Sequence, residues 1–167
     1  TLAAEPPDEQ IDTLEKLRLV EGVIPALLEL KRAGFGFVMV TNQDGLGSPG
    51  YPRAAYEKVQ AKLLEHFASQ GIVFEDVLVC PHLPSEGCSC RKPHLGLVRG
   101  YLSDRELDLP ACVAIGDRES DLELARNMGV RGFRLGAETW PDIVRTILNE
   151  GRRGSFRRKT SETEISA

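Results

Sequence analysis

The sequence predicts an α/β domain with a mainly parallel sheet. Short apolar runs typical of buried strands alternate along the chain with segments whose apolar residues recur at helical spacing. Parallel strands need such a crossover between them, because each strand must start again at the same end of the sheet. The 167 residues are enough for one domain with a core of its own.

The expected elements alternate from end to end. Residues 1–12 are expected to form a loop, because Pro6 and Pro7 are excluded from a helix interior. We expect helices at residues 22–33, 54–70, 93–101, 119–128 and 140–149, and strands at residues 35–40, 73–79, 112–115 and 130–135.

The first helix and the first strand show the pattern clearly. Val23, Leu27 and Leu30 share one helix face, and Gly34 ends the helix. Residues 35–40 form a nearly continuous apolar run, which indicates a strand buried on both faces.

The later elements follow from the same reasoning. The residues expected to face the core share one side of each helix, namely Val59, Leu63 and Phe67 in the second and Leu122 and Ala125 in the fourth. Pro93 is expected to open a helix, and Gly129 to end one. Cys112 lies in an apolar run, so we expect it in the core.

Composition and charge argue against several classes of partner and location. The formal charge of −4 argues against a nucleic-acid partner, and no apolar run approaches the length of a membrane span. The sequence shows no signal peptide, and its cysteine usage fits a reducing compartment. We therefore expect a cytoplasmic protein with neither a membrane nor a nucleic acid as partner.

The densest group of metal-type ligands lies in one short loop. Three thiols and an imidazole fall within eleven positions, at Cys80, His82, Cys88 and Cys90. Four such ligands close a tetrahedron around Zn²⁺, and a closed site of this kind is structural. Disulfides, buried free thiols and chance clustering are the alternatives. Arg91 and Lys92 follow the last ligand directly, which points to an anionic substrate, such as a phosphate.

Polar residues follow several of the expected strands. Thr41 and Asn42 follow one, Lys92 lies beyond another, and Asp117 and Asp121 follow a third. Ligands of parallel α/β sheets bind beyond the carboxyl ends of the strands, so these groups are expected to form a phosphate and Mg²⁺ site. The alternative for residues 117–121 is an ordinary helix N-terminus with capping side chains.

These stretches resemble a known family. Thr41 after its strand, Lys92 before Pro93, and residues 116–121 (Gly-Asp-Arg-Glu-Ser-Asp) look like the second, third and fourth motifs of the haloacid dehalogenase superfamily. Within it, residues 41–47, the metal-ligand loop and Glu5-Pro6-Pro7 resemble the histidinol-phosphatase half of bifunctional histidine-biosynthesis enzymes. The resemblance runs from Thr1 to about Asn149.

The resemblance implies a fold and a reaction. It implies a Rossmann-like, three-layer parallel sheet without a large cap domain, in which the zinc-binding loop and residues 42–47 shape substrate entry. The reaction implied is the Mg²⁺-dependent hydrolysis of histidinol phosphate through a phosphoaspartate. The resemblance implies that Asp117 binds Mg²⁺, that Thr41 donates to the phosphoryl group, and that Lys92 balances its negative charge. It further implies that Asp121 supports the Lys92 amine. The residues it implies as substrate ligands are Asn42, Gln43 and Arg91.

The two ends of the chain do not fit a complete phosphatase domain of this family. The family's first motif is Asp-x-Asp-Gly-Thr, of which only Thr1 is matched, so the nucleophile, the acid/base aspartate and their central strand are expected before residue 1. On this interpretation the chain alone is inactive. Residues 150–156 read as a linker, and residues 157–167 resemble the opening strand of imidazoleglycerol-phosphate dehydratase, which would add a lyase activity and a route to oligomers.

Two other interpretations stay open at this point. One is a heptose bisphosphate phosphatase of the same branch, although Asp44 and the dehydratase-like tail favour histidinol phosphate. The other is a non-catalytic, zinc-stabilised module, because the two motif-one aspartates are not in this sequence.

Overall fold

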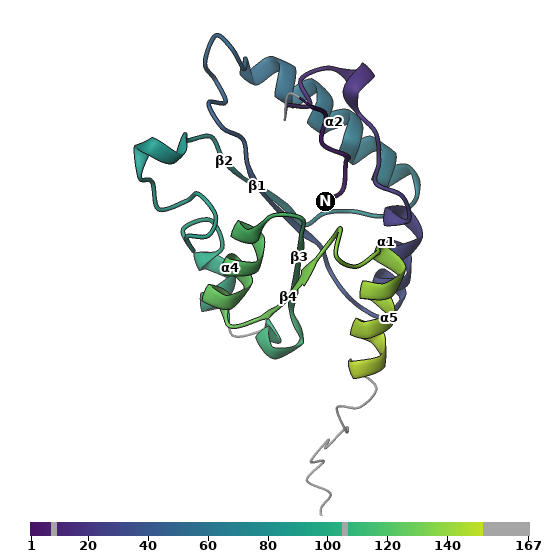
Figure 1. Cartoon of the computed structure of the whole chain (residues 1–167). Helices are drawn as coiled ribbons and strands as arrows, with labels where there is room; N and C mark the ends of the chain where they lie inside the picture. Colours follow the sequence, from purple (N-terminus) through teal and green to yellow (C-terminus); the bar gives the residue numbers. More distant parts are fainter. Residues whose placement is uncertain (8–9, 105–106, 152–167) are drawn as a thin grey trace, which may run out of the picture.

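The computed structural model describes residues 1–7, 10–104 and 107–151, and it is an α/β structure, as predicted. Four strands lie between α4 on one side and α1 and α5 on the other (Figure 1). The helices are α1 (Val23–Arg32), α2 (Arg53–Ser69), α3 (Arg99–Ser103), α4 (Glu119–Met128) and α5 (Trp140–Gly151), and the strands are β1 (Val38–Asn42), β2 (Asp76–Cys80), β3 (Val113–Gly116) and β4 (Arg131–Arg134). The linker and the dehydratase-like strand expected beyond Gly151 lie outside the described residues.

The strands form two parallel pairs. β1 pairs with β2, so that Thr41 lies opposite Val79 and Asn42 opposite Cys80, and β3 pairs with β4. In the described part of the chain, β1 and β3 are not hydrogen-bonded to each other. The strand expected between them was predicted to lie before residue 1.

The strand boundaries differ from those predicted. β1 begins at Val38 instead of residue 35 and continues through Thr41 and Asn42, and its residues are only partly buried. The aromatic residues before it pack on the core from a loop, which gave the run its apolar character without strand pairing. β2 likewise begins at Asp76, and Val73 is 66% exposed.

The helix expected from Pro93 is wrong over its first six residues. Residues 93–98 form turns after a cis Lys92–Pro93 bond, and the helix α3 begins at Arg99. The turns fold back onto the metal-ligand loop, where the Gly96 N–H donates to the Ser89 carbonyl at 3.0 Å. A Cβ atom at Gly96 would lie 2.3 Å from that oxygen, so only glycine fits this approach.

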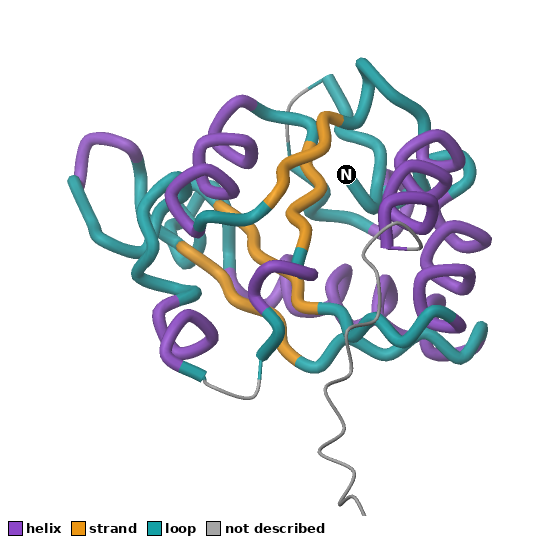
Figure 2. Tube along the Cα trace, turned by 90° about the horizontal axis from the view of Figure 1, so that it is seen from below, coloured by secondary structure: helices purple, strands orange, loops and turns teal. Residues whose placement is uncertain are grey.

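Helices lie on both sides of the strands (Figure 2). The main core is built largely from residues of α1, α2 and α5. Its most deeply buried members, each fully or almost fully excluded from water, are Val23, Phe67, Ile72, Ile143 and Val144. Burying each of these side chains contributes roughly 1.5–3 kcal/mol to folding. Among the described helices, none has both the length and the apolar character needed to cross a membrane.

The opposite face is covered by α4. Gly132 of β4 lies directly under the helix, where an added Cβ would meet the Ala125 methyl at 3.0 Å. The helix buries Leu124 and Ala125, whereas Leu122, which was expected to face inward, is only partly buried. Cys112 was also expected in the core, but it precedes β3 and is partly exposed, and its thiol donates to the Asp108 carbonyl.

Candidate active site

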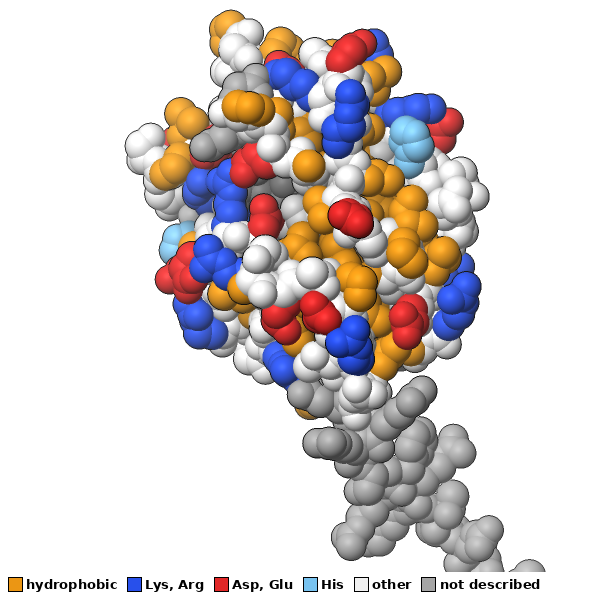
Figure 3. Space-filling view, turned by 45° about the vertical axis from the view of Figure 1, so that its right-hand side comes forward, with side chains coloured by type: hydrophobic (Ala, Val, Ile, Leu, Met, Phe, Trp, Pro, Cys, Tyr) orange, Lys and Arg blue, Asp and Glu red, His pale blue; other side chains and the backbone are white. Residues whose placement is uncertain are grey.

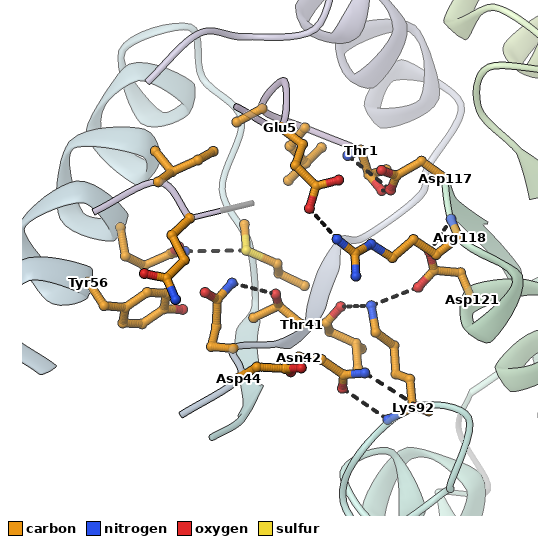
Figure 4. A pocket seen from close by; sticks show the side chains of 18 of the residues that line it. Thr1, Glu5, Thr41, Asn42, Asp44, Tyr56, Lys92, Asp117, Arg118 and Asp121 are labelled. Atoms are coloured by element: carbon orange, nitrogen blue, oxygen red, sulfur yellow. Dashed lines mark hydrogen bonds and ion pairs between the residues drawn. The ribbon is translucent and has the colours of Figure 1, made fainter. Parts of the chain in front are cut away.

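A cavity of about 690 Å³ opens at the carboxyl ends of β1 and β3. Acidic and basic side chains gather around a hollow in the surface (Figure 3). Residues that the sequence singled out line it together: Thr41, Asn42, Gln43, Arg91, Lys92, Asp117 and Asp121. They come from the end of β1, from the metal-ligand loop and from the junction of β3 with α4. The side chains of Thr41, Lys92, Asp117 and Asp121 point toward a common region (Figure 4).

Lys92 lies at the centre of this group of side chains. Its ammonium donates to the Val40 carbonyl at 2.9 Å and lies 2.7 Å from Oδ1 of Asp121. The side chains of Lys92 and Asp121 are 14% and 11% exposed, so the pair is largely screened from water. The other Asp121 oxygen accepts the Arg118 N–H at 3.0 Å, which fixes the start of α4. Asp121 thus supports the Lys92 amine, in the position the resemblance implied for it.

Gly116 makes the approach of Asp121 to the strand end possible. An added Cβ on Gly116 would lie 2.1 Å from the Cβ of Asp121, which no side chain can occupy without displacing the helix. The backbone of Gly116 at the end of β3 therefore packs directly against the Asp121 side chain in the first turn of α4. This contact sets the position of Asp117, which lies between them.

Asn42 is engaged by the backbone of Lys92. Its Oδ1 accepts the Lys92 N–H at 3.0 Å, and its Nδ2 donates to the Lys92 carbonyl at 3.3 Å. Both ends of the carboxamide therefore hold the neighbouring loop. Asn42, which was expected to bind substrate, lines the cavity, and its side chain joins the end of β1 to the loop that carries Lys92.

Asp117 follows β3 directly and lies beside the first residue of the chain. The Thr1 hydroxyl donates to its Oδ1, and the N-terminal ammonium lies 3.2 Å from the same oxygen. Burial acts to raise the pKa of Asp117, but the Thr1 hydroxyl and the ammonium outweigh it, so the pKa is lowered. The carboxylate is therefore ionised at neutral pH. It offers the hard oxygen ligands that Mg²⁺ prefers.

Thr41 and Gln43 form a second polar group at the end of β1. The Gln43 Nε2 donates to Oγ1 of Thr41 at 2.9 Å, and the Tyr51 hydroxyl donates to Oε1 of Gln43 at 2.8 Å. Gln43 was expected to bind substrate, and its side chain lies against Thr41 instead. Tyr51 was not predicted as a site residue, because it lies eight positions away with no motif of its own.

Arg91 is paired with Asp44. The guanidinium donates to both carboxylate oxygens, with the second contact at 3.0 Å, and also to the His82 carbonyl at 3.1 Å. Such bidentate pairs are among the stronger and more directional ion pairs. Arg91 lines the cavity as expected, but its charge joins residues 42–47 to the metal-ligand loop.

The four expected metal ligands converge at that loop. The Sγ atoms of Cys80, Cys88 and Cys90 lie 3.2–3.6 Å from one another, and Nδ1 of His82 lies 3.6 Å from Cys80 and 3.1 Å from Cys90. A tetrahedral zinc with bonds of about 2.3 Å to sulfur separates its sulfur ligands by roughly 3.8 Å. The observed cluster is a slightly compressed tetrahedron, so the donor set fits a metal ion. All four cysteines of the chain are free, and no two of them are joined by a disulfide in the structure.

The Cys80 thiol depends on such an ion for its charge. Burial raises the pKa of the Cys80 thiol to about 12, and the other two thiols beside it act in the same direction. A coordinated metal favours the thiolate, so metal binding would release the proton from this buried group.

One further ion pair at the cavity was missed from the sequence. Arg118 pairs with Glu5, which joins the N-terminal segment to the start of α4. The two residues are far apart in the chain, and only the Glu5-Pro6-Pro7 resemblance pointed to the first of them. The cavity carboxylates Glu5, Asp44, Asp117 and Asp121 thus each have a cationic partner.

Known proteins resemble this chain in both sequence and fold. A family model described as HAD-hydrolase-like matches residues 89–135. The Histidine biosynthesis bifunctional protein HisB of Xylella fastidiosa (strain 9a5c) is 50% identical over 171 residues, covering 99% of this chain and 46% of the relative. The protein of the same name from Campylobacter jejuni subsp. doylei is 48% identical, covering 99% and 47%. The chain thus spans about half the length of these relatives.

The solved structures agree on the fold. A D,D-heptose 1,7-bisphosphate phosphatase from B. bronchiseptica, complexed with magnesium and phosphate, superposes with a TM-score of 0.76 at 23% identity, covering 89% of this chain and 93% of that one. A putative HAD-like phosphatase from Mesorhizobium loti gives a TM-score of 0.72 at 22% identity, covering 89% and 82%. These likenesses show that the chain shares the fold of the two solved phosphatases, and the HAD-hydrolase-like family model matches residues 89–135 of it.

Proposed function

We propose that this chain is the phosphatase part of a longer enzyme that hydrolyses histidinol phosphate to histidinol and phosphate in histidine biosynthesis. One observation carries the proposal: Thr41, Lys92 and Asp117, a hydroxyl, an ammonium and a carboxylate, line one cavity at the strand ends. Relatives about half identical to the chain and named for histidine biosynthesis support the pathway. A cytoplasmic location follows from that role.

The roles proposed for the three residues follow from their chemistry. The Thr41 hydroxyl donates to a phosphoryl oxygen. The Lys92 ammonium balances negative charge on the phosphate, while Asp121 and the Val40 carbonyl keep it in place. The Asp117 carboxylate would hold Mg²⁺, which, when bound, neutralises charge on the phosphoryl oxygens.

The nucleophile is proposed to be an aspartate on the amino side of Thr1. The Thr1 nitrogen lies 3.2 Å from Asp117, so a residue joined to it would lie at the site. Of the other cavity carboxylates, Asp44, Asp121 and Glu5 are already paired with arginine or lysine side chains, and Asp117 is the proposed Mg²⁺ ligand. The aspartate oxygen would bond to phosphorus as the ester bond breaks, and a second carboxylic acid would protonate the departing alkoxide. Water would then cleave the phosphoaspartate and release phosphate.

The metal of the cysteine loop is proposed to be structural zinc. Three thiolates and an imidazole suit Zn²⁺, and four protein ligands leave no open position for substrate. The metal would fix the loop from which Arg91 and Lys92 reach the cavity. The longer protein is further proposed to dehydrate imidazoleglycerol phosphate in its other half, as the resemblance of residues 157–167 suggests.

A heptose bisphosphate is the second candidate substrate, because the B. bronchiseptica enzyme shares the fold. The experiment that separates them is phosphate release by the full-length protein with Mg²⁺, measured on histidinol phosphate and on the heptose bisphosphate. We expect kcat/KM to be at least about a hundredfold higher for histidinol phosphate, the scale that one well-placed polar contact can give. The reverse preference would assign the other substrate, and release from neither would support the non-catalytic module.

A further inference from the structure

We propose that Gln43 and Tyr51 are positioning residues that fix the direction in which the Thr41 hydroxyl donates its hydrogen. This inference rests on the proposed function, because it concerns how Thr41 presents that hydrogen to a phosphoryl oxygen. It gives Gln43 a role other than direct contact with the substrate. It also brings Tyr51 into the site although Tyr51 belongs to none of the family's motifs.

The first step of the argument is the hydrogen-bonding capacity of a hydroxyl. A threonine hydroxyl has one hydrogen to donate and two lone pairs that accept. The Gln43 Nε2 donates to Thr41 Oγ1 at 2.9 Å and so occupies one lone pair (Figure 4). The hydrogen of Thr41 cannot point along that bond. It is left to point elsewhere, and Thr41 lines the cavity.

The second step is the orientation of the Gln43 amide. A carboxamide can turn over, which would replace the Nε2 donor by an acceptor and reverse the hydrogen bond to Thr41. In the observed orientation the Tyr51 hydroxyl donates to Gln43 Oε1 at 2.8 Å, so both ends of the amide have a partner while Nε2 faces Thr41. Burial, together with the charge of Asp12, raises the pKa of Tyr51, so this hydroxyl remains a protonated donor at neutral pH.

The third step is the rigidity of the two supports. The Tyr51 side chain is only 2% exposed, and its ring packs edge-on against Tyr56 with 6.3 Å between ring centroids. The Gln43 N–H donates to the Cys80 carbonyl at 2.8 Å, so the backbone is anchored to the end of β2. Tyr51, Gln43 and Thr41 therefore form a short chain of donors that all run toward the cavity.

The test is a double-mutant cycle in the full-length, Mg²⁺-loaded protein. Phosphate release is measured for Gln43→Ala, Thr41→Ala and the double variant. Gln43→Ala alone is expected to lower kcat about tenfold, the effect of one lost hydrogen bond, with little change in KM. In the Thr41→Ala background, the same substitution is expected to change kcat less than about twofold, because no hydroxyl remains to be oriented.

Two isosteric variants and two controls sharpen the test. Gln43→Glu replaces the donor by an acceptor that would take the Thr41 hydrogen itself, so it should lower kcat more than Gln43→Ala does. Tyr51→Phe keeps the buried ring and should lower kcat in the same direction as Gln43→Ala. The matched controls are Gln70→Glu and Tyr101→Phe, two exposed or partly exposed positions away from the cavity, which should leave kcat unchanged.

The outcomes separate this inference from the proposed function. A wild-type protein that releases no phosphate from any phosphomonoester overturns the proposed function, and the inference with it. An active wild type in which Gln43→Ala lowers kcat equally with and without Thr41 overturns the inference alone. A rise in KM at unchanged kcat would also overturn it, because that pattern marks Gln43 as a direct substrate ligand.

Discussion

The ammonium of Lys92 lies 2.7 Å from a carboxylate oxygen of Asp121, and both side chains are at least 86% shielded from solvent. A pair of this kind is not itself a large source of stability, because the two charges lose their hydration on folding. Removing one partner, however, leaves an uncompensated charge in a low-dielectric surrounding. The pair therefore links the position of the Lys92 ammonium to the stability of the fold.

This relationship predicts an asymmetric stability cost. Asp121→Ala in the full-length protein should lower the free energy of unfolding of this domain by about 3–5 kcal/mol, measured by chemical denaturation. Glu123→Ala on the same helix removes an exposed carboxylate 3.7 Å from Arg126 and should cost less than about 0.5 kcal/mol. Equal effects of the two substitutions would show that the Lys92–Asp121 pair is not shielded.

The carboxamide of Asn42 leads to a second prediction. Asn42→Asp keeps the oxygen that accepts the Lys92 N–H but replaces the donor to the Lys92 carbonyl by a second oxygen. The two facing oxygens should repel, lowering the free energy of unfolding by about 1–3 kcal/mol and reducing turnover through displacement of Lys92. Asn127→Asp, which loses a single exposed contact to the Pro93 carbonyl, is the control. A larger effect at Asn127 would contradict the assignment.

The acidic residue at the start of α5 predicts a pH dependence. The pKa of Asp142 is lowered, chiefly because the Thr139 hydroxyl donates to its carboxylate, and Arg145 adds to the effect. A lowered folded-state pKa means that the ionised carboxylate stabilises the fold above its unfolded pKa of about 3.9. That stability is lost as the pH falls through the folded pKa.

Asp142→Asn should therefore lower the melting temperature at pH 7 but have progressively less effect as the pH falls below about 4. Thermal unfolding of the variant and the wild type, followed at pH 7 and below about pH 4, checks this. If the difference in melting temperature between the variant and the wild type grew on acidification, the ionised carboxylate would not be the stabilising form.

The metal-ligand loop predicts a link between metal content and activity. Purified full-length protein should contain about one zinc per chain at this site, and Cys88→Ser should lower its affinity or remove it. Phosphatase turnover should fall with the zinc, because the loop that carries Lys92 would lose its anchor. Cys112→Ser, at the cysteine outside the cluster, should retain both zinc and turnover. Elemental analysis that finds no zinc in the wild type would overturn the assignment.

Much of the fold could be predicted from local pattern. The helices α1, α2, α4 and α5 were found within a few residues, because their apolar faces and glycine ends are local features. The strand boundaries were less accurate, since Phe35 and Phe37 are apolar for packing and not for strand pairing. The turns after Pro93 depend on contact of Gly96 with the metal-ligand loop, which no local pattern shows.

The candidate site was likewise predictable only in part. The metal-ligand cluster and the convergence of Thr41, Lys92 and Asp117 could be predicted, because short spacing and strand ends bring these residues together. The hydrogen-bond partners of Asn42, Gln43 and Arg91 could not, because side-chain partners depend on the local geometry of the site and not on sequence pattern. In all three cases a polar side chain expected to face substrate was found bound to another part of the protein.

The most direct test of the central claim is a Mg²⁺ titration of phosphate release from histidinol phosphate by the full-length protein and its Asp117→Asn variant. An amide offers one neutral oxygen where the carboxylate offers charge, so the variant should need far more Mg²⁺ and turn over at least about a hundredfold more slowly. Its zinc content should be unchanged, since the cysteine cluster is separate. A variant whose titration curve matches that of the wild type would contradict the account.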